Sequence, residues 1–462
     1  MVFDGARWLY DHLPPTLQNT ACTAAGVARL RARYGPGQRR WQRFFERSGG
    51  WSDAELREYR RQRLREVLRH AYEHVPFHRQ RFREAGVLPD EIRDVDDLAR
   101  LPLLDKADVV RAGRGMLADD VDPRALHVHT TSGSTGTPLT LYRSADAVHA
   151  LYGFSWARLR AGLGFRDPYA SFAGAGIVPV GARRPPFWRT NAAANQRLYS
   201  VFHLREDHLG DYARALQEQE LAYIEGYPAP VFLIADWIER QGFRFTNRPR
   251  AVFSTAEVLR PQHRAALERV FGACVRDQYS QAEACGSITE RRCGHLHEDL
   301  DYGVLELLPV GREGRLVRAE IVCTSLHNLA WPLIRYRVGD LCLVDPDARC
   351  ECGLPGRIIE RIEGRTGEGF RLPDGTRITN ISVIAKRCRH VRFLQVIQEE
   401  IGRIQVRVVP DDGYRRDRDG PALVREFRAR LGEALAIDVV YAREPELSAK
   451  GKLLSIIDRT VG

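Results

Sequence analysis

The sequence lacks a hydrophobic run of the roughly 18–20 residues that a membrane-spanning helix requires, so we expect no membrane partner. Residues 1–8 contain neither a basic nor an apolar segment, which predicts a cytoplasmic protein without a signal peptide. The chain also lacks a basic stripe interleaved with aromatic residues. Its formal net charge of +10 therefore indicates arginine used as the general surface cation, and we expect no nucleic-acid partner.

The remaining composition is typical of a globular protein. The chain has 462 residues, 44% of them hydrophobic, and this length predicts two or three domains. Nine cysteines occur without an export signal, a combination that favours reduced thiols or metal ligands over disulfides.

Residues 130–138 are rich in hydroxyl side chains and glycine, and they separate two short apolar segments, 126–128 and 139–141. We expect a loop that joins two strands. Glycine lets backbone N–H groups approach a ligand, and several N–H groups in one concavity bind anions. A polar surface turn is the alternative, because the run lacks the terminal lysine of the GxxxxGK[ST] phosphate loop.

Hydrophobic spacing predicts helices at residues 52–75, 145–163, 207–222 and 231–238, with short strands between the later ones. Ser52 and Glu55 have the spacing of a capping box, and Pro76 ends the first helix. Strands that alternate with helices predict an α/β fold with a parallel sheet, in which ligands bind at the carboxyl ends of strands.

Three carboxylates follow predicted strands. Glu257 and Glu283 each end a strand and turn in the dipeptide Ala-Glu, and a parallel sheet would place both at one edge. Carboxylates at such an edge suit a divalent cation that carries nucleotide phosphates, whereas helix N-capping is the alternative for each. Asp340 ends a strand after a glycine, where it can accept charge-assisted hydrogen bonds of ~1.5–3 kcal/mol from ribose hydroxyls.

The C-terminal region predicts a small α+β domain. Residues 404–408 and 437–441 alternate like strands, and residues 421–435 have helical spacing. Lys450 and Lys452 lie in the tail, where surface solubility is the alternative to a functional role.

Soft metal ligands form two groups about fifty residues apart. Cys293, His295 and His297 precede Cys350 and Cys352, which suits a tetrahedral structural zinc. We expect the ligands to be Cys293, His297, Cys350 and Cys352, with His295 as a competing ligand. Buried thiols with surface histidines, or a redox dithiol, are the alternatives.

Five ordered motifs resemble those of the adenylate-forming ligases, in the phenylacetate–CoA ligase and CapK-like branch. They are TSGSTGTP (131–138), STAEVL (254–259), DQYSQAE (277–283), PLIRYRVGDL (332–341) and the terminal SAKGK (448–452), and the segment RIEGR (361–365) also matches. The helical region with AYEHVPFHRQRF (71–82) extends the resemblance over nearly the whole chain. Two departures are Ser280, where glycine is usual, and the sequence after Arg365, which lacks the usual hinge acid.

The resemblance implies the roles of individual residues. Glu283 would hold Mg²⁺, Asp340 the ribose, and Lys452 would be the catalytic lysine, with Lys450 as the second choice. The acid pocket would involve Tyr223, Gly226, Tyr227 and the stretch 172–179. The other nucleotide-binding residues would be Thr131, Ser132, Gly133, Ser134, Thr135, Gly136, Ala256, Glu257, Gln278, Tyr279, Arg361 and Arg365.

The resemblance also implies an architecture and a reaction. Residues 1–364 would form an adenylation domain with parallel sheets and helices, and residues 365–462 a small mobile domain joined to it by a hinge at residues 364–368. The enzyme would use ATP and Mg²⁺ to convert a carboxylic acid into an acyl-adenylate and pass the acyl group to CoA. An amine acceptor is the alternative, as is a non-catalytic nucleotide-binding protein, and a homodimer stays open.

Overall fold

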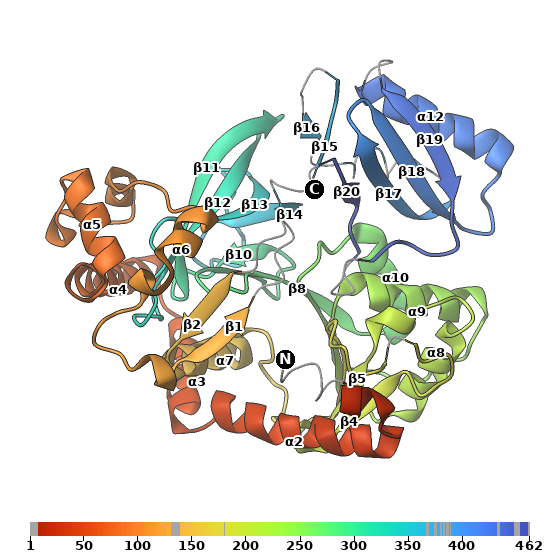
Figure 1. Cartoon of the computed structure of the whole chain (residues 1–462), viewed down its shortest axis with the longest axis horizontal. Helices are drawn as coiled ribbons and strands as arrows, with labels where there is room; N and C mark the ends of the chain where they lie inside the picture. The colour runs from red at the N-terminus through yellow and green to blue at the C-terminus, as the bar shows by residue number, and fades with distance from the viewer. Residues whose placement is uncertain are drawn as a thin grey trace.

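The computed structural model describes residues 8–130, 139–179, 181–365, 369–373, 377–378, 381, 384, 388, 390–431, 435–447 and 453–460. Within these residues, twelve strands form one large sheet and four form a smaller C-terminal sheet (Figure 1). No helix among them is both long and apolar enough to cross a membrane.

The large sheet has a parallel half and an antiparallel half. Strands β5, β3, β6, β7 and β8 lie side by side in this order and are parallel. Their bounds are β3 (Tyr169–Phe172), β5 (Gln196–Tyr199), β6 (Tyr223–Gly226), β7 (Ala251–Thr255) and β8 (Cys274–Ser280), with β4 (Trp188–Asn191) antiparallel at the edge. The antiparallel half contains β9 (Ser287–Glu290), β10 (Leu296–Glu298), β11 (Gly303–Glu313), β12 (Leu316–Ser325), β13 (Tyr336–Val344) and β14 (Ile358–Arg365).

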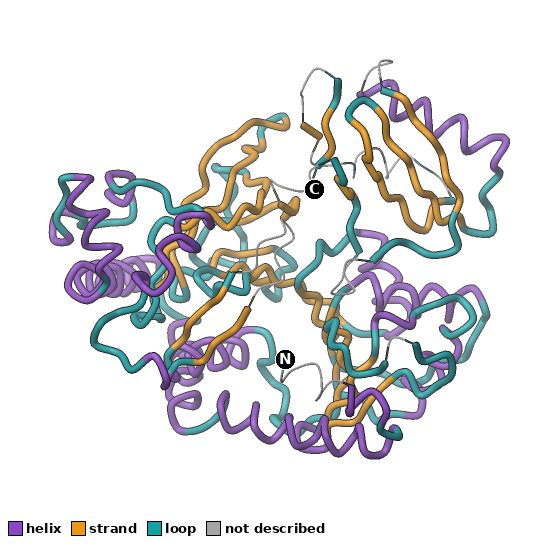
Figure 2. The backbone as a smooth tube through the Cα atoms, viewed as in Figure 1, coloured by secondary structure: helices purple, strands orange, loops and turns teal. Residues whose placement is uncertain are grey.

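Helices surround these strands (Figure 2). One face of the parallel half packs against α8 (Leu209–Glu218), α9 (Pro228–Arg240) and α10 (Pro261–Phe271) in a core that includes Ile224, Val252 and Val275. These residues alternate with Tyr223 and Phe253, which face a smaller cluster that contains Leu159, the residue after α7 (Ala145–Arg158). The strand period of two therefore buries both faces, as a parallel sheet requires.

The N-terminal region of the chain adds further helices, with the bounds α2 (Pro15–Arg33), α3 (Pro36–Ser48), α4 (Asp53–His74), α5 (Pro76–Ala85) and α6 (Lys106–Ala112). The predicted capping box at Ser52 and Glu55 begins α4, since the Ser52 side chain accepts from the Glu55 N–H while the Glu55 carboxylate accepts from the Ser52 N–H. Short 3₁₀ turns occur at η1 (Pro89–Glu91), η2 (Asp96–Arg100), η3 (Gly113–Met116), η4 (Pro123–Ala125), η5 (Ala192–Ala194) and η6 (Val201–His203).

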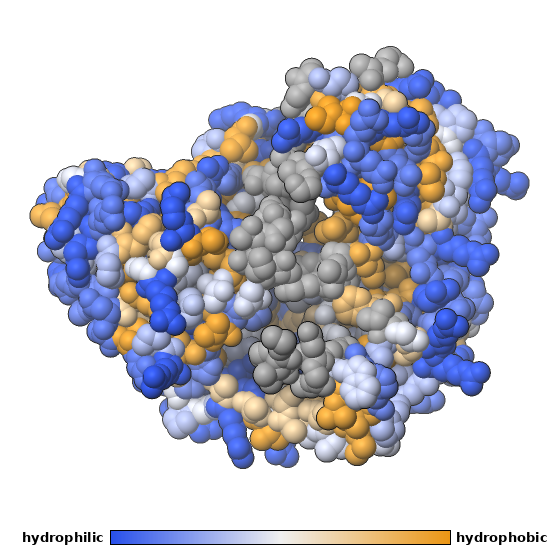
Figure 3. Space-filling model, in the orientation of Figure 1, coloured by the Kyte–Doolittle hydropathy of each residue, from blue (hydrophilic) through white to orange (hydrophobic). Residues whose placement is uncertain are grey.

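The C-terminal sheet has the strand order β19-β18-β17-β20 and its own core, which includes Val396, Val406 and Phe427. Its elements are β17 (Val391–Glu400), β18 (Arg403–Pro410), α12 (Arg416–Leu431), β19 (Ala436–Tyr441) and β20 (Ile456–Asp458), preceded by the short pair β15 (Phe370–Arg371) and β16 (Arg377–Ile378). Figure 3 shows hydrophilic residues over most of α4, α5 and α12, as expected for helices whose apolar sides face inward.

The predicted fold class is confirmed, and several predicted bounds need correction. Helix α7 ends at Arg158 instead of residue 163, and α8 covers residues 209–218 instead of 207–222. Helix α12 begins at Arg416, five residues before the predicted start, because Pro421 lies inside the helix and not at its first turn.

Candidate functional site

The carboxyl ends of β6, β7 and β8 lie at one edge of the large sheet, because these strands are parallel neighbours. Gly226 ends β6 with φ +144°, and a Cβ added there would lie 2.3 Å from the Phe172 carbonyl oxygen. Only glycine fits this close approach of two backbones. The backbone N–H of the next residue, Tyr227, donates a hydrogen bond to the same Phe172 carbonyl oxygen at 2.9 Å.

The turns after β7 and β8 both contain an alanine in the left-handed region. Ala256 has φ +65° and Ala284 has φ +56°. This conformation costs a non-glycine residue ~1–3 kcal/mol, and such strain concentrates at binding sites and active sites. The strained alanines are neighbours in sequence of Glu257 and Glu283, the two carboxylates that the Ala-Glu motifs singled out.

Two tyrosine hydroxyls hold carboxylates at this edge. The Tyr279 hydroxyl, from β8, donates to Asp340 Oδ2 at 2.9 Å, and the Tyr336 hydroxyl, from β13, donates to Glu283 Oε1 at 3.3 Å. Burial and the nearby Asp340 carboxylate raise the pKa of Tyr279 well above its usual value, so the phenol stays protonated and acts as a donor. The structure thus brings Tyr279, Glu283 and Asp340 together.

Sequence reasoning missed Tyr336 as a member of this group. Tyr336 lies four residues before Asp340 in β13, and the strand period of two predicts that both side chains lie on one face. Arg143, also missed, ends β2 (Thr140–Arg143) and donates to the Ala282 carbonyl, which ties that strand to the turn carrying Glu283.

The strands on either side of the hydroxyl-rich loop are as predicted. β1 (His127–Thr130) and β2 pair in antiparallel fashion, with Thr130 opposite Thr140. The predicted phosphate-binding residues lie outside the described part of the chain: Thr131, Ser132, Gly133, Ser134, Thr135 and Gly136.

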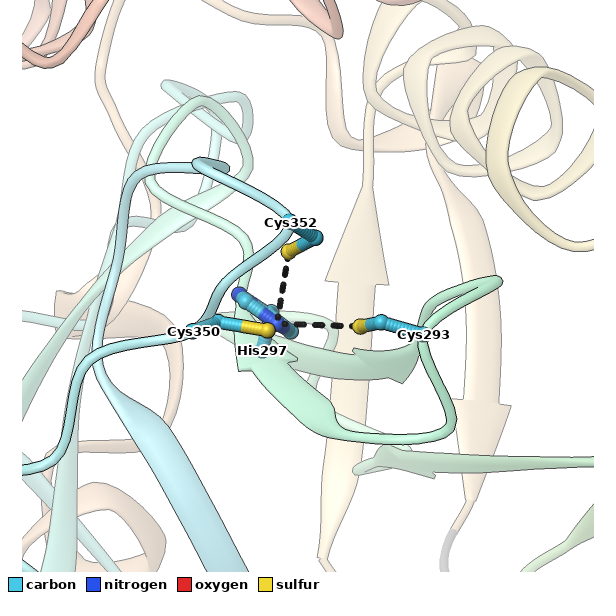
Figure 4. Close-up of side chains that lie close together, drawn as sticks. All are labelled: Cys293, His297, Cys350 and Cys352. Atoms are coloured by element: carbon cyan, nitrogen blue, oxygen red, sulfur yellow. Dashed lines mark hydrogen bonds between the residues drawn. The ribbon is translucent and has the colours of Figure 1, made fainter.

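The four predicted metal ligands lie together next to strands β10 and β14 of the antiparallel half (Figure 4). The turn before β10 carries Cys293, β10 carries His297, and the segment before β14 carries Cys350 and Cys352. The pairing of β10 with β14 brings the two groups together. One ligand atom from each residue lies within 4.8 Å of the others.

The distances within this group suit a tetrahedral zinc ion. With bonds of about 2.3 Å to sulfur and about 2.0 Å to nitrogen, two ligands in a tetrahedron lie roughly 3.5–3.8 Å apart. His297 Nε2 lies 3.5 Å from Cys293 Sγ and 3.7 Å from Cys352 Sγ. The competing ligand, His295, is exposed, and its Nδ1 lies 3.2 Å from Cys350 Sγ.

Comparison with known proteins shows what the chain is similar to. Residues 371–459 match the CapK C-terminal domain. The chain is 24% identical to protein CapK of Staphylococcus aureus over 92% of this chain and 93% of that protein. It is 27% identical to phenylacetate–coenzyme A ligase of Pseudomonas putida over 68% of this chain and 71% of that protein. The chain is thus similar to CapK and to phenylacetate–CoA ligases over most of its length, which confirms the predicted resemblance.

Among solved structures, a 2-hydroxyisobutyryl-CoA ligase in the postadenylation state shares the fold, with a TM-score of 0.67 and 19% identity over 89% of this chain and 91% of that one. The predicted fold class is therefore confirmed.

Within the adenylate-forming ligase fold, one predicted substrate residue is misplaced. Tyr223 begins β6, three residues before the carboxyl end, and is 3% exposed. Its ring stacks on Tyr169 with the centroids 4.6 Å apart. Tyr223 is thus a core residue, and we remove it from the candidate acid pocket. Gly226 and Tyr227 stay at the edge, and burial raises the pKa of Tyr227 to about 12.

The remaining predicted residues have mixed placements. Gln278 is half-buried in β8. The Arg361 guanidinium forms ion pairs with Glu313 at 2.7 Å and Glu363 at 3.0 Å, so its charge is compensated within the sheet and is not directed to a phosphate. Asp340 lies within β13 and not at the end of a strand as predicted, and its backbone pairs with that of Arg365 in β14. The Arg365 side chain, Lys450 and Lys452 lie outside the described residues.

Proposed function

We propose that this chain is an ATP-dependent, AMP-forming carboxylic acid ligase that forms an acyl-adenylate and transfers the acyl group to CoA. The observation that carries the proposal is a pair of tyrosine-held carboxylates next to the carboxyl end of β8: Glu283 follows that strand, and the Tyr279 hydroxyl from the same strand holds Asp340. Ligands of open α/β sheets bind at the carboxyl ends of strands, and the two carboxylates differ in what they can bind.

Each carboxylate has a distinct role. Glu283, half-buried beside the Tyr336 hydroxyl, is the ligand for Mg²⁺, which would neutralise phosphate charge. Asp340 accepts hydrogen bonds from the ribose, and the buried Tyr279 hydroxyl orients its carboxylate. The substrate carboxylate attacks the α-phosphorus in line and pyrophosphate leaves. The protein contributes position and charge compensation to this step.

The cation next to the reacting oxygens is Lys452. At ~4 Å and an effective dielectric of ~20, a lysine contributes at most ~4 kcal/mol before desolvation. The acyl-adenylate then reacts with the acceptor thiol. We assign residues 1–364 to the adenylation domain and residues 365–462 to the C-terminal domain, supported by the separate core of the smaller sheet.

An amine acceptor, which would give an amide, is the second candidate. The sequence after Arg365 departs from that of standard acyl–CoA ligases, and residues 371–459 match the CapK C-terminal domain, so the acceptor stays open between a thiol and an amine. A non-catalytic nucleotide-binding protein would have no need of Glu283, Asp340 and Lys452 together. The structural zinc, the cytoplasmic location and the homodimer stay predictions.

The test is an ATP–pyrophosphate exchange screen across carboxylic acids, repeated with CoA and with amines. With a cognate acid, Glu283→Gln should weaken Mg²⁺-dependent exchange and Asp340→Ala should weaken ATP binding, each by tenfold or more, because each change removes a charge-assisted contact. Glu313→Gln, which changes a carboxylate paired with Arg361 outside this edge, is the control and should exchange at the parent rate. Parent rates for both site variants would place the nucleotide elsewhere.

A further inference from the structure

The turn after β7 contacts the C-terminal tail directly. Glu257 Oε1 accepts a hydrogen bond from the Leu453 N–H at 2.9 Å, across 196 residues of sequence. Its other oxygen, Oε2, accepts from the Ala229 N–H in the first turn of α9 at 3.4 Å. The left-handed Ala256 immediately precedes this carboxylate. One side chain thus joins the turn, the start of a helix and the tail.

A second residue of the same turn contacts the tail two residues further on. The Arg260 guanidinium donates to Ser455 Oγ. Glu257 and Arg260 therefore contact Leu453 and Ser455, residues that alternate along an extended segment. Because Glu257 accepts from a backbone N–H and Arg260 donates to a hydroxyl oxygen, the two contacts together define the orientation of the tail.

The smaller domain holds the intervening residue. Gln395 Nε2 donates to the Leu454 carbonyl at 2.7 Å and to the Glu446 carbonyl at 2.8 Å, and the Val396 N–H donates to the Ser455 carbonyl at 2.9 Å. Residues 453–455 are consequently bound on one side by β17 and on the other by the turn after β7. In Figure 1 the dark blue tail lies between the C-terminal sheet and α10.

Apolar contacts surround these polar ones. Leu453 packs against the core of the large domain, and so do Phe393 and Val409 of the C-terminal sheet, which are each 2% exposed. Exclusion of water strengthens a hydrogen bond to a carboxylate, because the local dielectric is low. The Glu257–Leu453 contact is thus placed where it stabilises one arrangement of the two domains.

We infer that Glu257 and Arg260 form the docking site for the C-terminal tail, and that Glu257 is a positioning residue instead of the nucleotide ligand that its motif predicted. The docking itself is independent of the reaction. Its consequence rests on the proposed function: Leu453 follows Lys452 directly in the sequence, so the docking of Leu453 limits how far Lys452 can lie from the turn after β7.

The direct test is hydrogen–deuterium exchange of the full chain. Glu257→Ala should raise exchange at least tenfold in the peptide that contains residues 453–460, because it removes the acceptor for the Leu453 N–H. Peptides from β8 and β12 should be unchanged. Glu239→Ala is the matched control, since Glu239 ends α9 in an exposed pair with Arg269 and should change nothing in the tail. Unchanged tail exchange, or a rise throughout the large domain, would overturn the inference.

A second variant and a binding measurement keep the result unambiguous. Arg260→Gln should raise tail exchange without involving Glu257, and Glu257→Gln, which keeps one acceptor oxygen, should have an intermediate effect. Equilibrium binding of ATP with Mg²⁺ should differ less than twofold between Glu257→Ala and the parent. A tenfold loss of ATP affinity would instead make Glu257 a nucleotide ligand. These measurements hold even if no acid supports pyrophosphate exchange, so a failure of the docking site and a failure of the proposed function are distinguishable.

Discussion

Three buried histidines, His78, His263 and His327, contribute to how the folded protein responds to acid. Burial lowers the pKa of His78 and of His263 to about 3, and that of His327 to about 4. His78 Nε2 lies 2.8 Å from the Pro332 carbonyl and its Nδ1 lies 3.1 Å from Arg81, contacts that fit a neutral ring which donates from Nε2 and accepts at Nδ1. His263 stacks on Phe232 with the ring centroids 4.4 Å apart.

These residues predict a loss of stability as the pH falls. Their folded pKa values lie below the unfolded value of 6.5, so below pH 6.5 the unfolded chain binds protons that the folded chain does not. The free energy of unfolding should therefore decrease from about pH 6.5 towards pH 4. His263→Phe should reduce this slope by about one proton, or about 1.4 kcal/mol per pH unit, in urea denaturation. The exposed His12→Ala is the control, and an unchanged slope for His263→Phe would contradict the assignment.

Residue positions at the site were predictable where a local motif identified them. Glu283 follows β8, whose carboxyl end lies beside that of β7 because the two strands are parallel neighbours. Asp340 lies within β13 in the antiparallel half, and the Tyr279 hydroxyl of β8 holds it near that end. The partners of these residues were not predictable in the same way. The contact between Glu257 and Leu453 joins segments 196 residues apart, so no local pattern contains it.

At the scale of elements, local chemistry fixed some bounds and tertiary packing fixed others. Pro261 and Gly272 delimit α10, since proline suits a first helical turn and glycine a left-handed C-cap. Helix α2 went unpredicted because its buried stripe is Gln18, Cys22 and Gly26 instead of a row of large apolar residues. Gln18 accepts from Arg189 at 2.6 Å, and a polar contact of this kind gives no hydrophobic period.

The pairing of β10 with β14 leads to a prediction about zinc. Purified protein should contain about one zinc per chain by elemental analysis, and Cys352→Ser should lower both the zinc content and the thermal midpoint, since a structural site can contribute ~10 kcal/mol or more to folding. Cys274→Ser is the control, because Cys274 is exposed in β8 and is not part of the cluster. A metal-free protein with the heat stability of the parent would exclude a structural role for zinc.

At the scale of the whole molecule, ion pairs add to the docking of the two domains. Arg392 of β17 lies 3.3 Å from Glu206 and 3.1 Å from Asp236, and Arg240 pairs with the same two acids. The Phe393 ring lies 5.9 Å from that of Phe232 on α9. The sequence predicted a separate C-terminal domain from its strand and helix pattern. It held no signal for this interface, because the charges and rings come from three separate segments: β17, α9 and the segment with Glu206.

This interface leads to a prediction about the two half-reactions. The tail is docked on the turn after β7 in this arrangement. One rigid placement of the smaller domain could hardly both exclude water during adenylation and admit a bulky acceptor, so two domain arrangements are the economical solution. Lys452→Ala removes a cation matched to charge that develops during adenylation, and in single-turnover measurements it should slow adenylate formation by orders of magnitude. The same variant should spare transfer from a supplied acyl-adenylate, because that step runs with the tail undocked.

Lys450→Ala is the matched control and should slow adenylate formation much less than Lys452→Ala. Equal slowing of both half-reactions by Lys452→Ala would indicate a folding role, and a larger effect of Lys450→Ala would move the assignment to that lysine.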